Sequence, residues 1–432
     1  MKYLNDFIYL LALAAFSPKI LFRVLTQNRY KQGWRERLGK ISRKYPDKKC
    51  IWIHAVSVGE VNATKTIIAE LKKRLPDYEI ILSATTDTGI ERAQKLYGNE
   101  LTVFYFPFDF SSVIHRAFKN LNPSICLLME LEVWPNFTSR AHQLKIPVVV
   151  VNGRISDRSF PKYSLVKFFV KPTFKKVSLF LAQSKEYADR FIAIGGHHKT
   201  TIITGSLKYD TAQITEKVEG ADLLAKQLNI AARRLWVAGG TGPNEEKIIL
   251  DVFEKIKKQA GYSDLRLVIV PRKPERFNEV ADLIKKSGFE LTRYSLIKAG
   301  EKNETNQDAI ILGDTMGDLR KFYSLATVVF VGRTLVPMGG SDMMESAAMA
   351  KCTIFGPFTF NFKQTVQALL QAQGAIEVEN EKELRFAVQK CLDEPQFAHQ
   401  IAQNGQNVIK ENQGATQKSV DAIVGLVVSE RT

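Results

Sequence analysis

Short apolar runs that alternate with helix-forming stretches constrain the fold of this chain more than any other feature of its sequence. The runs are rich in valine and isoleucine, and the stretches between them are spaced as helices are. This pattern is typical of parallel strands that are buried on both faces within βαβ units. The first set of runs spans 50–56, 79–85, 101–106, 124–129, 147–152 and 178–183, and the second spans 234–240, 265–270, 308–314, 326–331 and 352–356.

The segment 204–234 separates the two sets, has no strand-like core and is helical in its second half. The sequence therefore predicts an α/β protein of two doubly wound, Rossmann-like domains that face each other across a cleft. Ligands of such domains bind at the carboxyl ends of the strands, so we expect the functional residues there.

The net charge of +16 is concentrated at the start of the chain, where residues 1–50 hold twelve Lys and Arg against three acids. The apolar run 7–16 (FIYLLALAAF) is shorter than the roughly 20 residues of a full membrane span. We expect residues 1–30 to hold an uncleaved membrane-anchor helix, seated in one leaflet with its cations at anionic headgroups. An ordinary N-terminal helix and a cleaved secretory signal are the alternatives. Residues 158–176, which interleave cations with aromatics, form a candidate second membrane contact.

Two classes of function are disfavoured by what the sequence lacks. We find no helix-turn-helix, RNA-binding motif or platform of aromatic and basic residues, so no nucleic-acid partner is expected. The four cysteines are isolated, and neither a CxxC pair nor an HExxH motif occurs. A structural zinc or a disulfide framework is therefore not expected, and the chain fits a reducing compartment.

Four groups of polar residues follow predicted strands. Glu60 comes after 50–56, at the start of a helical stretch; Glu130 and Glu132 close the strand 124–129. Lys208 lies at the predicted domain junction, and Glu345 follows a glycine-rich turn that runs into a helix. Three cations at 270–277, namely Arg272, Lys273 and Arg276, also suit an anionic ligand.

Each group also has a structural interpretation. Glu60 in a first helical turn is a common partner of the helix dipole. Glu130 and Glu132 could be surface carboxylates and Lys208 a linker charge. Asp342 could cap its helix, and Met343, Met344 and Met349 are typical of core packing.

Taken together, the segments resemble the 3-deoxy-D-manno-octulosonic acid (Kdo) transferases of lipopolysaccharide assembly. The motifs that carry the resemblance run in order along nearly the whole chain: WIHAVSVGEV (52–61), TTDTG (85–89), MELEVWPN (129–136), NGRISDRS (152–159), GSLKYD (205–210), VPRKPERF (270–277), GDTMGDL (313–319) and GPFTFNFK (356–363). The resemblance implies an inverting enzyme with a glycosyltransferase-B fold, without metal or other cofactor, at the cytoplasmic face of the inner membrane. It implies Kdo transfer from CMP-Kdo to the lipid A precursor (lipid IVA).

The same resemblance assigns roles to residues of this chain. It makes residues 31–206 the acceptor domain and 207–432 the donor domain, with the last helix packing back on the first domain. Glu60 becomes the general base, a carboxylate that the positive helix end would keep ionised, and Glu130 and Lys208 stabilise the transition state. The CMP contacts are Pro271, Arg272, Met316, Gly317, Asp318, Asp342, Met343, Met344 and Glu345, the last of them on the ribose hydroxyls.

Three positions depart from the family pattern. The family commonly has Gly-Gly-His-Asn where this chain has Gly339-Gly340-Ser341-Asp342, and a histidine where it has Gly242. Three alternatives therefore remain: another glycosyltransferase-B enzyme, a nucleotide-sugar epimerase, and a non-catalytic membrane-bound protein that binds nucleotide sugars.

Overall fold

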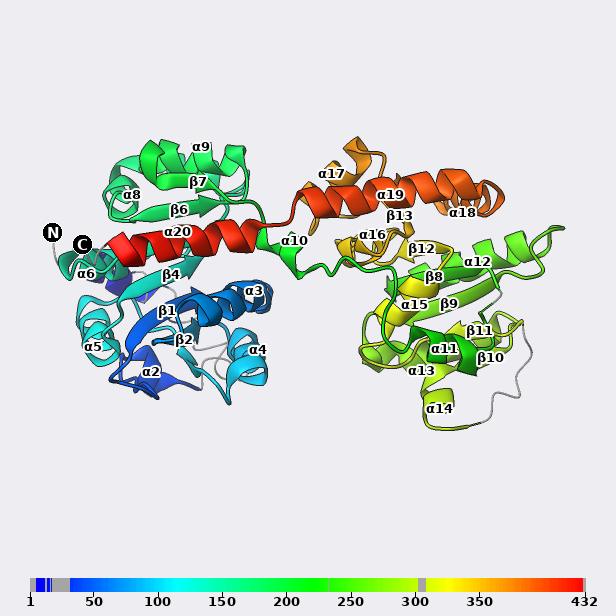
Figure 1. Cartoon of the computed structure of the whole chain (residues 1–432), viewed down its shortest axis with the longest axis horizontal. Coiled ribbons are helices and arrows are strands. Elements are labelled where there is room, and N and C mark those ends of the chain that lie inside the picture. The colour runs from blue at the N-terminus through cyan, green and yellow to red at the C-terminus, as the bar shows by residue number, and fades with distance from the viewer. Residues whose placement is uncertain are drawn as a thin grey trace. The chain divides into compact units, whose positions relative to one another are not determined.

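The computed structural model describes residues 5–11, 14, 15, 17, 32–231, 233–301 and 308–429. The chain divides into two compact units (Figure 1). Unit 1 comprises Met1–Thr211 and Gln413–Thr432, and unit 2 comprises Ala212–Asn412. Much of the predicted anchor, including all of 18–30, lies outside the described residues. Within the described ranges, no helix has the length and apolarity that crossing a bilayer requires.

Unit 1 is built on a sheet of seven parallel strands in the order β3-β2-β1-β4-β5-β6-β7. Its strands are β1 (Lys49–Ala55), β2 (Tyr78–Ala84), β3 (Thr102–Tyr105), β4 (Ile125–Met129), β5 (Val148–Gly153), β6 (Leu179–Ala182) and β7 (Thr201–Ile203). Its helices are α2 (Trp34–Arg37), α3 (Val58–Arg74), α4 (Asp87–Tyr97), α5 (Ser111–Leu121), α6 (Pro135–Gln143), α7 (Phe160–Leu165), α8 (Lys167–Phe174), α9 (Lys185–Ile194), α10 (Leu207–Thr211) and α20 (Ala415–Ser429).

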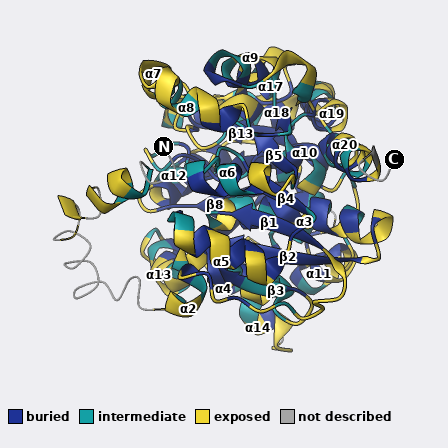
Figure 2. Cartoon of the chain, turned by 90° about the vertical axis from the view of Figure 1, so that its left-hand side faces the viewer, coloured by how far each residue is buried: buried dark blue, intermediate teal, exposed yellow. Residues whose placement is uncertain are grey.

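Both faces of this sheet are buried, as the apolar runs predict (Figure 2). Along β1, Ile51 and Ile53 pack into one core and Trp52 into the core on the opposite face, because side chains alternate along a strand. The last helix, α20, returns to unit 1 and packs against α3. Arg74 binds Asp421 of that helix at 2.8 Å.

Unit 2 repeats the same plan with seven parallel strands in the order β10-β11-β9-β8-β12-β13-β14. Its strands are β8 (Leu235–Thr241), β9 (Arg266–Pro271), β10 (Leu291–Arg293), β11 (Ile310–Leu312), β12 (Val328–Val331), β13 (Cys352–Phe355) and β14 (Ile376–Glu377). Its helices are α11 (Ala221–Leu228), α12 (Glu245–Lys257), α13 (Phe277–Lys286), α14 (Tyr294–Lys298), α15 (Leu319–Leu325), α16 (Met344–Ala348), α17 (Lys363–Gln371), α18 (Glu381–Asp393) and α19 (Pro395–Glu411). The prediction of two doubly wound α/β units with parallel sheets is confirmed.

The strand order indicates where a ligand of each unit is expected to bind. In unit 1 the order reverses between β1 and β4, and in unit 2 it reverses between β8 and β12. Neighbouring loops at such a reversal run to opposite faces of the sheet and leave a crevice at the carboxyl ends of the strands. Glu60 follows β1, and Glu130 and Glu132 follow β4, so all three carboxylates belong to the crevice of unit 1.

Candidate active site

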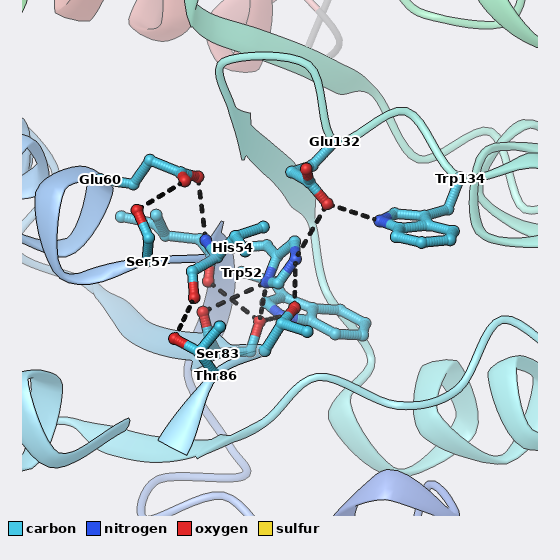
Figure 3. Close-up of polar contacts among 11 residues, drawn as sticks. Trp52, His54, Ser57, Glu60, Ser83, Thr86, Glu132 and Trp134 are labelled. Carbon is cyan, nitrogen blue, oxygen red and sulfur yellow. Dashed lines mark hydrogen bonds and ion pairs between the residues drawn. The ribbon is translucent and has the colours of Figure 1, made fainter. Parts of the chain in front are cut away.

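Glu60 is folded back over the start of its own helix. Ser57 precedes α3 with an extended backbone, and Glu60 is the third residue of the helix. Its Oε2 accepts the backbone N–H of Val56 at 2.9 Å, and its Oε1 accepts the Ser57 hydroxyl at 3.0 Å (Figure 3). This is a variant of the capping box, in which a carboxylate at the third position satisfies donors that precede the helix. The carboxylate is thereby fixed at the carboxyl end of β1.

The surroundings of Glu60 change its acidity. Burial raises the pKa of Glu60, the Val56 N–H and the Ser57 hydroxyl lower it, and the nearby charge of Glu130 raises it again. The net shift is upward: the donors at the helix start lower the pKa and favour the ionised form, as expected, but the loss of water outweighs them. A raised pKa makes the carboxylate a stronger proton acceptor.

Glu130 lies on strained backbone directly after β4. Its φ is 54°, in the left-handed region, although its backbone N–H still donates to the Val151 carbonyl at 2.9 Å. A non-glycine residue in this region costs about 1–3 kcal/mol, and such strain gathers at functional sites. Its carboxylate lies 3.4 Å from a guanidinium nitrogen of Arg154.

Glu132 is held by an indole and lies beside a buried imidazole. The Trp134 Nε1–H donates to Glu132 Oε2 at 2.9 Å, and His54 Nε2 lies 3.9 Å from the same oxygen (Figure 3). Burial, followed by the charges of Glu60 and Glu130, raises the pKa of Glu132 to about 7. Burial lowers the pKa of His54 to about 3, so its ring is neutral and forms no ion pair with Glu132.

His54 itself is fixed by packing and by β2. Its ring stacks on Phe106 with centroids 3.7 Å apart, and Nδ1 lies 3.2 Å from the Ser83 carbonyl and 3.1 Å from its hydroxyl. Because a carbonyl only accepts, Nδ1 carries the proton and Nε2 is the bare nitrogen on the Glu132 side. Trp52 Nε1 donates to the same Ser83 hydroxyl at 2.8 Å. The floor of the site is therefore rigid.

Lys208 belongs to unit 1 and not to a linker. It lies on α10, which packs against α3, the helix of Glu60. The first residue of α10, Leu207, donates its backbone N–H to the side-chain oxygen of Asn152 at 3.1 Å. Asp210, at the other end of α10, accepts the Gly414 N–H at 2.7 Å. Asn152 follows the β5 valines with a left-handed φ of 56°, so two predicted motifs, 152–159 and 205–210, meet at this bond.

In unit 2, a buried carboxylate joins the loops after β8 and β12. Glu245 Oε1 accepts the N–H groups of Thr334 and Leu335 at 2.9 and 3.0 Å. Its Oε2 accepts those of Arg333 and Gly242 at 2.6 and 3.2 Å. Four backbone donors thus converge on one side chain, and these are the two loops that flank the strand-order reversal.

Glu345 lies beside a group of charged residues. Burial raises its pKa, Asp342 raises it further, and Arg320 and Arg272 lower it, so these four groups are electrostatic neighbours. Asp342 Oδ1 accepts the Met344 N–H at 2.9 Å, so this acid holds the start of its short helix as the structural interpretation has it. The side chains of Met343 and Met344 are buried in the core.

Some of the residues predicted at 270–277 and 313–319 as ligand contacts bind other side chains of unit 2, whereas others lie at the edges of loops. Arg276 is bound to Glu246 at 2.6 Å and to Glu279 at 2.7 Å, so two carboxylates already bind the guanidinium that was expected to suit an anionic ligand. Asp318 is buried, which raises its pKa, but hydrogen bonds from Lys298, Lys321 and Thr315 lower it to about 2. The other predicted contacts lie at loop edges: Pro271 ends β9, Arg272 follows it, Met316 is 72% exposed, and Gly317 has a left-handed φ of 92°.

Comparison with known proteins decides the family. The family model described as 3-deoxy-D-manno-octulosonic-acid transferase (kdotransferase) matches residues 32–211, nearly all of the first segment of unit 1. A 3-deoxy-D-manno-octulosonic acid transferase of Haemophilus influenzae is 34% identical over 400 residues, which cover 91% of each chain. This chain belongs to the Kdo transferase family. A Bordetella pertussis Kdo transferase is 27% identical over 430 residues, covering 96% of this chain and 98% of its own.

Solved structures show the same fold in more distant proteins. A glycosyltransferase from Rickettsia africae aligns at a TM-score of 0.56 over 88% of this Kdo transferase and 99% of its own chain, with 13% identity. A putative UDP-N-acetylglucosamine 2-epimerase from Listeria monocytogenes aligns at 0.56 over 87% and 96%, also with 13% identity. These likenesses concern the fold alone, which two types of nucleotide-sugar enzyme share.

Two positions at which this Kdo transferase departs from the family pattern, Gly242 and Ser341, are closely surrounded by other groups of unit 2. A Cβ on Gly242 would lie 2.8 Å from the Met338 sulfur and 3.0 Å from Arg333 Cγ, so a histidine there requires both side chains to move. Ser341 donates its hydroxyl to the Gly240 carbonyl at 2.7 Å and fixes the glycine turn. Gly242 and Ser341 thus lie in the loops after β8 and β12 of unit 2.

Replacing Glu132 with glutamine should change how stability depends on pH. A carboxyl whose folded pKa is about 7, against 4.5 when unfolded, binds more protons in the folded state, so wild-type stability falls as pH rises through this window. Glu132→Gln removes that loss. Between pH 5 and pH 8, the free energy of unfolding of the variant should therefore rise by up to about 3 kcal/mol relative to that of wild type. Urea unfolding at both pH values measures the gain. Burial also raises the pKa of Asp109 to about 7. Asp109 is present in both proteins, so its contribution to the pH dependence cancels in the comparison. Parallel pH curves would disprove the shift.

Proposed function

We propose that this Kdo transferase takes Kdo from CMP-Kdo bound at unit 2 and transfers it to a hydroxyl of a lipid A precursor bound at unit 1. Family membership supports Kdo transfer. One observation supports the assignment of the acceptor to unit 1. Glu60 is a half-buried carboxylate with a raised pKa, fixed at the strand-order reversal of unit 1. This is the group that a hydroxyl acceptor requires, because transfer removes its proton.

The proposed step is an inverting displacement. The acceptor oxygen forms a bond to the anomeric carbon of Kdo while the bond from that carbon to the CMP phosphate oxygen breaks. Glu60 takes the hydroxyl proton, and CMP leaves with the bonding pair. Positive charge develops on the sugar carbon, which the Glu130 carboxylate stabilises, and Lys208 offsets negative charge on the donor.

Donor choice separates this proposal from its alternatives. Purified protein is incubated with CMP-Kdo or with UDP-N-acetylglucosamine, with and without acceptor, and released nucleotide is measured. The proposal predicts CMP release that depends on acceptor. UDP release or epimerisation of the UDP-sugar would favour the epimerase alternative, and binding of CMP-Kdo without CMP release would favour the non-catalytic one.

We further propose that Glu345 binds the ribose hydroxyls of CMP. Glu345→Ala should weaken CMP binding by roughly 1.5–3 kcal/mol, about 10- to 150-fold, the value of a hydrogen bond to a charged group. Asp342→Asn is the matched control: it keeps the oxygen that accepts the Met344 N–H and removes a charge beside Glu345, so CMP affinity should stay equal or rise. Calorimetric titration with CMP measures both, and unchanged affinity in Glu345→Ala would remove it from the site.

We propose that the enzyme works at the cytoplasmic face of the inner membrane, with residues 1–30 as its anchor. The support is the charge of residues 1–50, where twelve cations face three acids. Each cation near an anionic surface contributes about 1 kcal/mol of binding.

A further inference from the structure

The described N-terminal helical turns, residues 5–11, are joined to unit 1 by polar side chains. Asp6 Oδ1 accepts the backbone N–H of Ser111 and the side-chain amide of Asn136, both at 2.9 Å. Asn5 donates its side-chain amide to Asn136 Oδ1 at 3.2 Å. Tyr9 donates its hydroxyl to Asp109 at 2.9 Å. We call these five side chains and their bonds the polar clasp: Asn5, Asp6, Tyr9, Asp109 and Asn136.

The opposite side of the same turns is apolar and exposed. Phe7, Ile8, Leu10 and Leu11 are between 51% and 59% exposed. A helix of a soluble protein turns its apolar stripe toward the core and its polar residues outward. Here the arrangement is reversed, since the polar clasp faces unit 1 and the apolar residues face away from it.

A second exposed apolar group lies on α7 and α8, which Figure 2 shows as exposed turns. Leu165, Phe168 and Phe169 are between 73% and 87% exposed. The exposed lysines among them are Lys162, Lys167, Lys171 and Lys175. This group flanks α6, because α8 packs against α6 and Lys176 binds Ser139 at 2.7 Å.

An anionic bilayer is the partner that these two groups fit. Large apolar side chains exposed together mark an interaction surface, and cations interleaved with them match acidic headgroups. A protein partner would also cover apolar side chains, but it gives no reason for lysine at both ends of the cluster.

The clasp also lies on the chain segment that carries Glu132 and Glu130, the latter proposed to stabilise the transition state. Asn136 is the last residue of the MELEVWPN motif, four positions after Glu132. Asp109 accepts the backbone N–H groups of Asn136 and Phe137 at 2.9 and 2.8 Å, so it caps the start of α6 while it binds Tyr9. The route from Tyr9 and Asp6 to Glu132 therefore passes through α6 and Trp134.

We propose that the polar clasp is a positioning device, which ties the membrane-seated helix to the loop of Glu130 and Glu132 and thereby sets the height of that loop above the bilayer. This inference rests on the proposed function for its catalytic part, and its membrane part stands independently. Within unit 1, a shift of the loop relative to the helix would break the clasp, because its hydrogen bonds connect residues 5–9 to Asp109, Ser111 and Asn136.

The test uses the full chain, with two variants of the N-terminal turns. The clasp variant, Asp6→Ala with Tyr9→Phe, removes bonds to Ser111, Asn136 and Asp109. The face variant, Phe7→Ser with Leu10→Ser and Leu11→Ser, keeps the clasp and removes apolar surface. Vesicles of phosphatidylethanolamine and phosphatidylglycerol carry the tetra-acylated lipid A precursor. Flotation measures binding, and turnover is measured on vesicles and on acceptor dispersed in detergent.

The clasp variant should float with vesicles within about twofold of wild type, because its apolar face is intact. Its turnover on vesicles should fall about 10-fold or more, as misplaced reacting groups cost that much, and its turnover in detergent should stay near wild type. The face variant should lose flotation and keep turnover in detergent.

Wild-type turnover of the clasp variant on vesicles would overturn the positioning role. Undiminished flotation of the face variant would overturn the bilayer assignment and leave a protein partner. If wild type transfers no Kdo at all, the proposed function fails, while flotation still decides the membrane part.

Discussion

Replacing Glu60 with glutamine should lower the turnover of Kdo transfer by at least about 100-fold, the low end for loss of a general base. Glutamine keeps the shape of the side chain: its oxygen can accept the Val56 N–H, and its amide N–H can donate to the Ser57 hydroxyl. It cannot take a proton. CMP affinity and melting temperature should remain close to those of wild type, because CMP is assigned to unit 2. Steady-state kinetics with CMP-Kdo and the lipid A precursor measures the effect.

The control for this substitution lies on the same helix. Glu70 on α3 has Lys73 at 3.4 Å at the surface, an arrangement worth about 0–1 kcal/mol. Glu70→Gln should leave turnover unchanged. A Glu60→Gln enzyme near the wild-type rate would refute Glu60 as the base and move the search to Glu130 and Glu132. If the melting temperature fell instead, Glu60 would be a structural cap.

Replacing Glu245 with alanine should destabilise unit 2 by at least about 3 kcal/mol, because four backbone N–H groups, two of them in buried bonds, lose their acceptor. Glu245→Gln should lower the free energy of unfolding by less than Glu245→Ala does, but still by more than about 1 kcal/mol. The amide NH2 of glutamine cannot accept, so the backbone N–H groups that bound the replaced oxygen are left unsatisfied. Urea unfolding gives the free energies, and hydrogen exchange of the β8 and β12 amides localises the loss.

Glu254→Gln on the same helix is the matched control. Glu254 pairs with Lys258 at 2.8 Å on the surface, so this substitution should change stability by less than about 0.5 kcal/mol. Equal, small losses in Glu245→Ala and Glu254→Gln would show that the two loops of unit 2 are held by other contacts.

The sheets could be predicted because their strands carry a strong local signal. Four successive valines, 148–151, lie in β5, and a run buried on both faces has no other common explanation. The strands β7, β10 and β14 were missed, since they have only two or three residues, and β7 and β14 are largely exposed. Such edge strands form because a neighbouring strand offers hydrogen bonds, which their own sequence does not reveal.

The sequence predicted the site residues that directly follow a strand. It did not predict contacts between residues that are far apart in the sequence. Glu60 and Glu130 could be placed from strand ends alone. The neutral His54 beside Glu132 could not, because burial by Phe106 and Ser83 determines it. Asn152 binds the backbone N–H of Leu207, the neighbour of Lys208, from 55 positions away, and Glu246 binds Arg276 from 30 positions away. A long-range pair gives no periodic signal, so the partners of Arg276 could not be predicted from the sequence.

The mass of the lipid product tests the central claim most directly. Purified full-length protein is incubated with CMP-Kdo and the tetra-acylated lipid A precursor, and the lipid fraction is analysed by mass spectrometry. We expect the acceptor to gain the mass of one or more Kdo residues, with one CMP released for each Kdo added. Glu60→Gln should give far less product in the same time. An unmodified acceptor after prolonged incubation with folded wild-type protein would contradict this expectation.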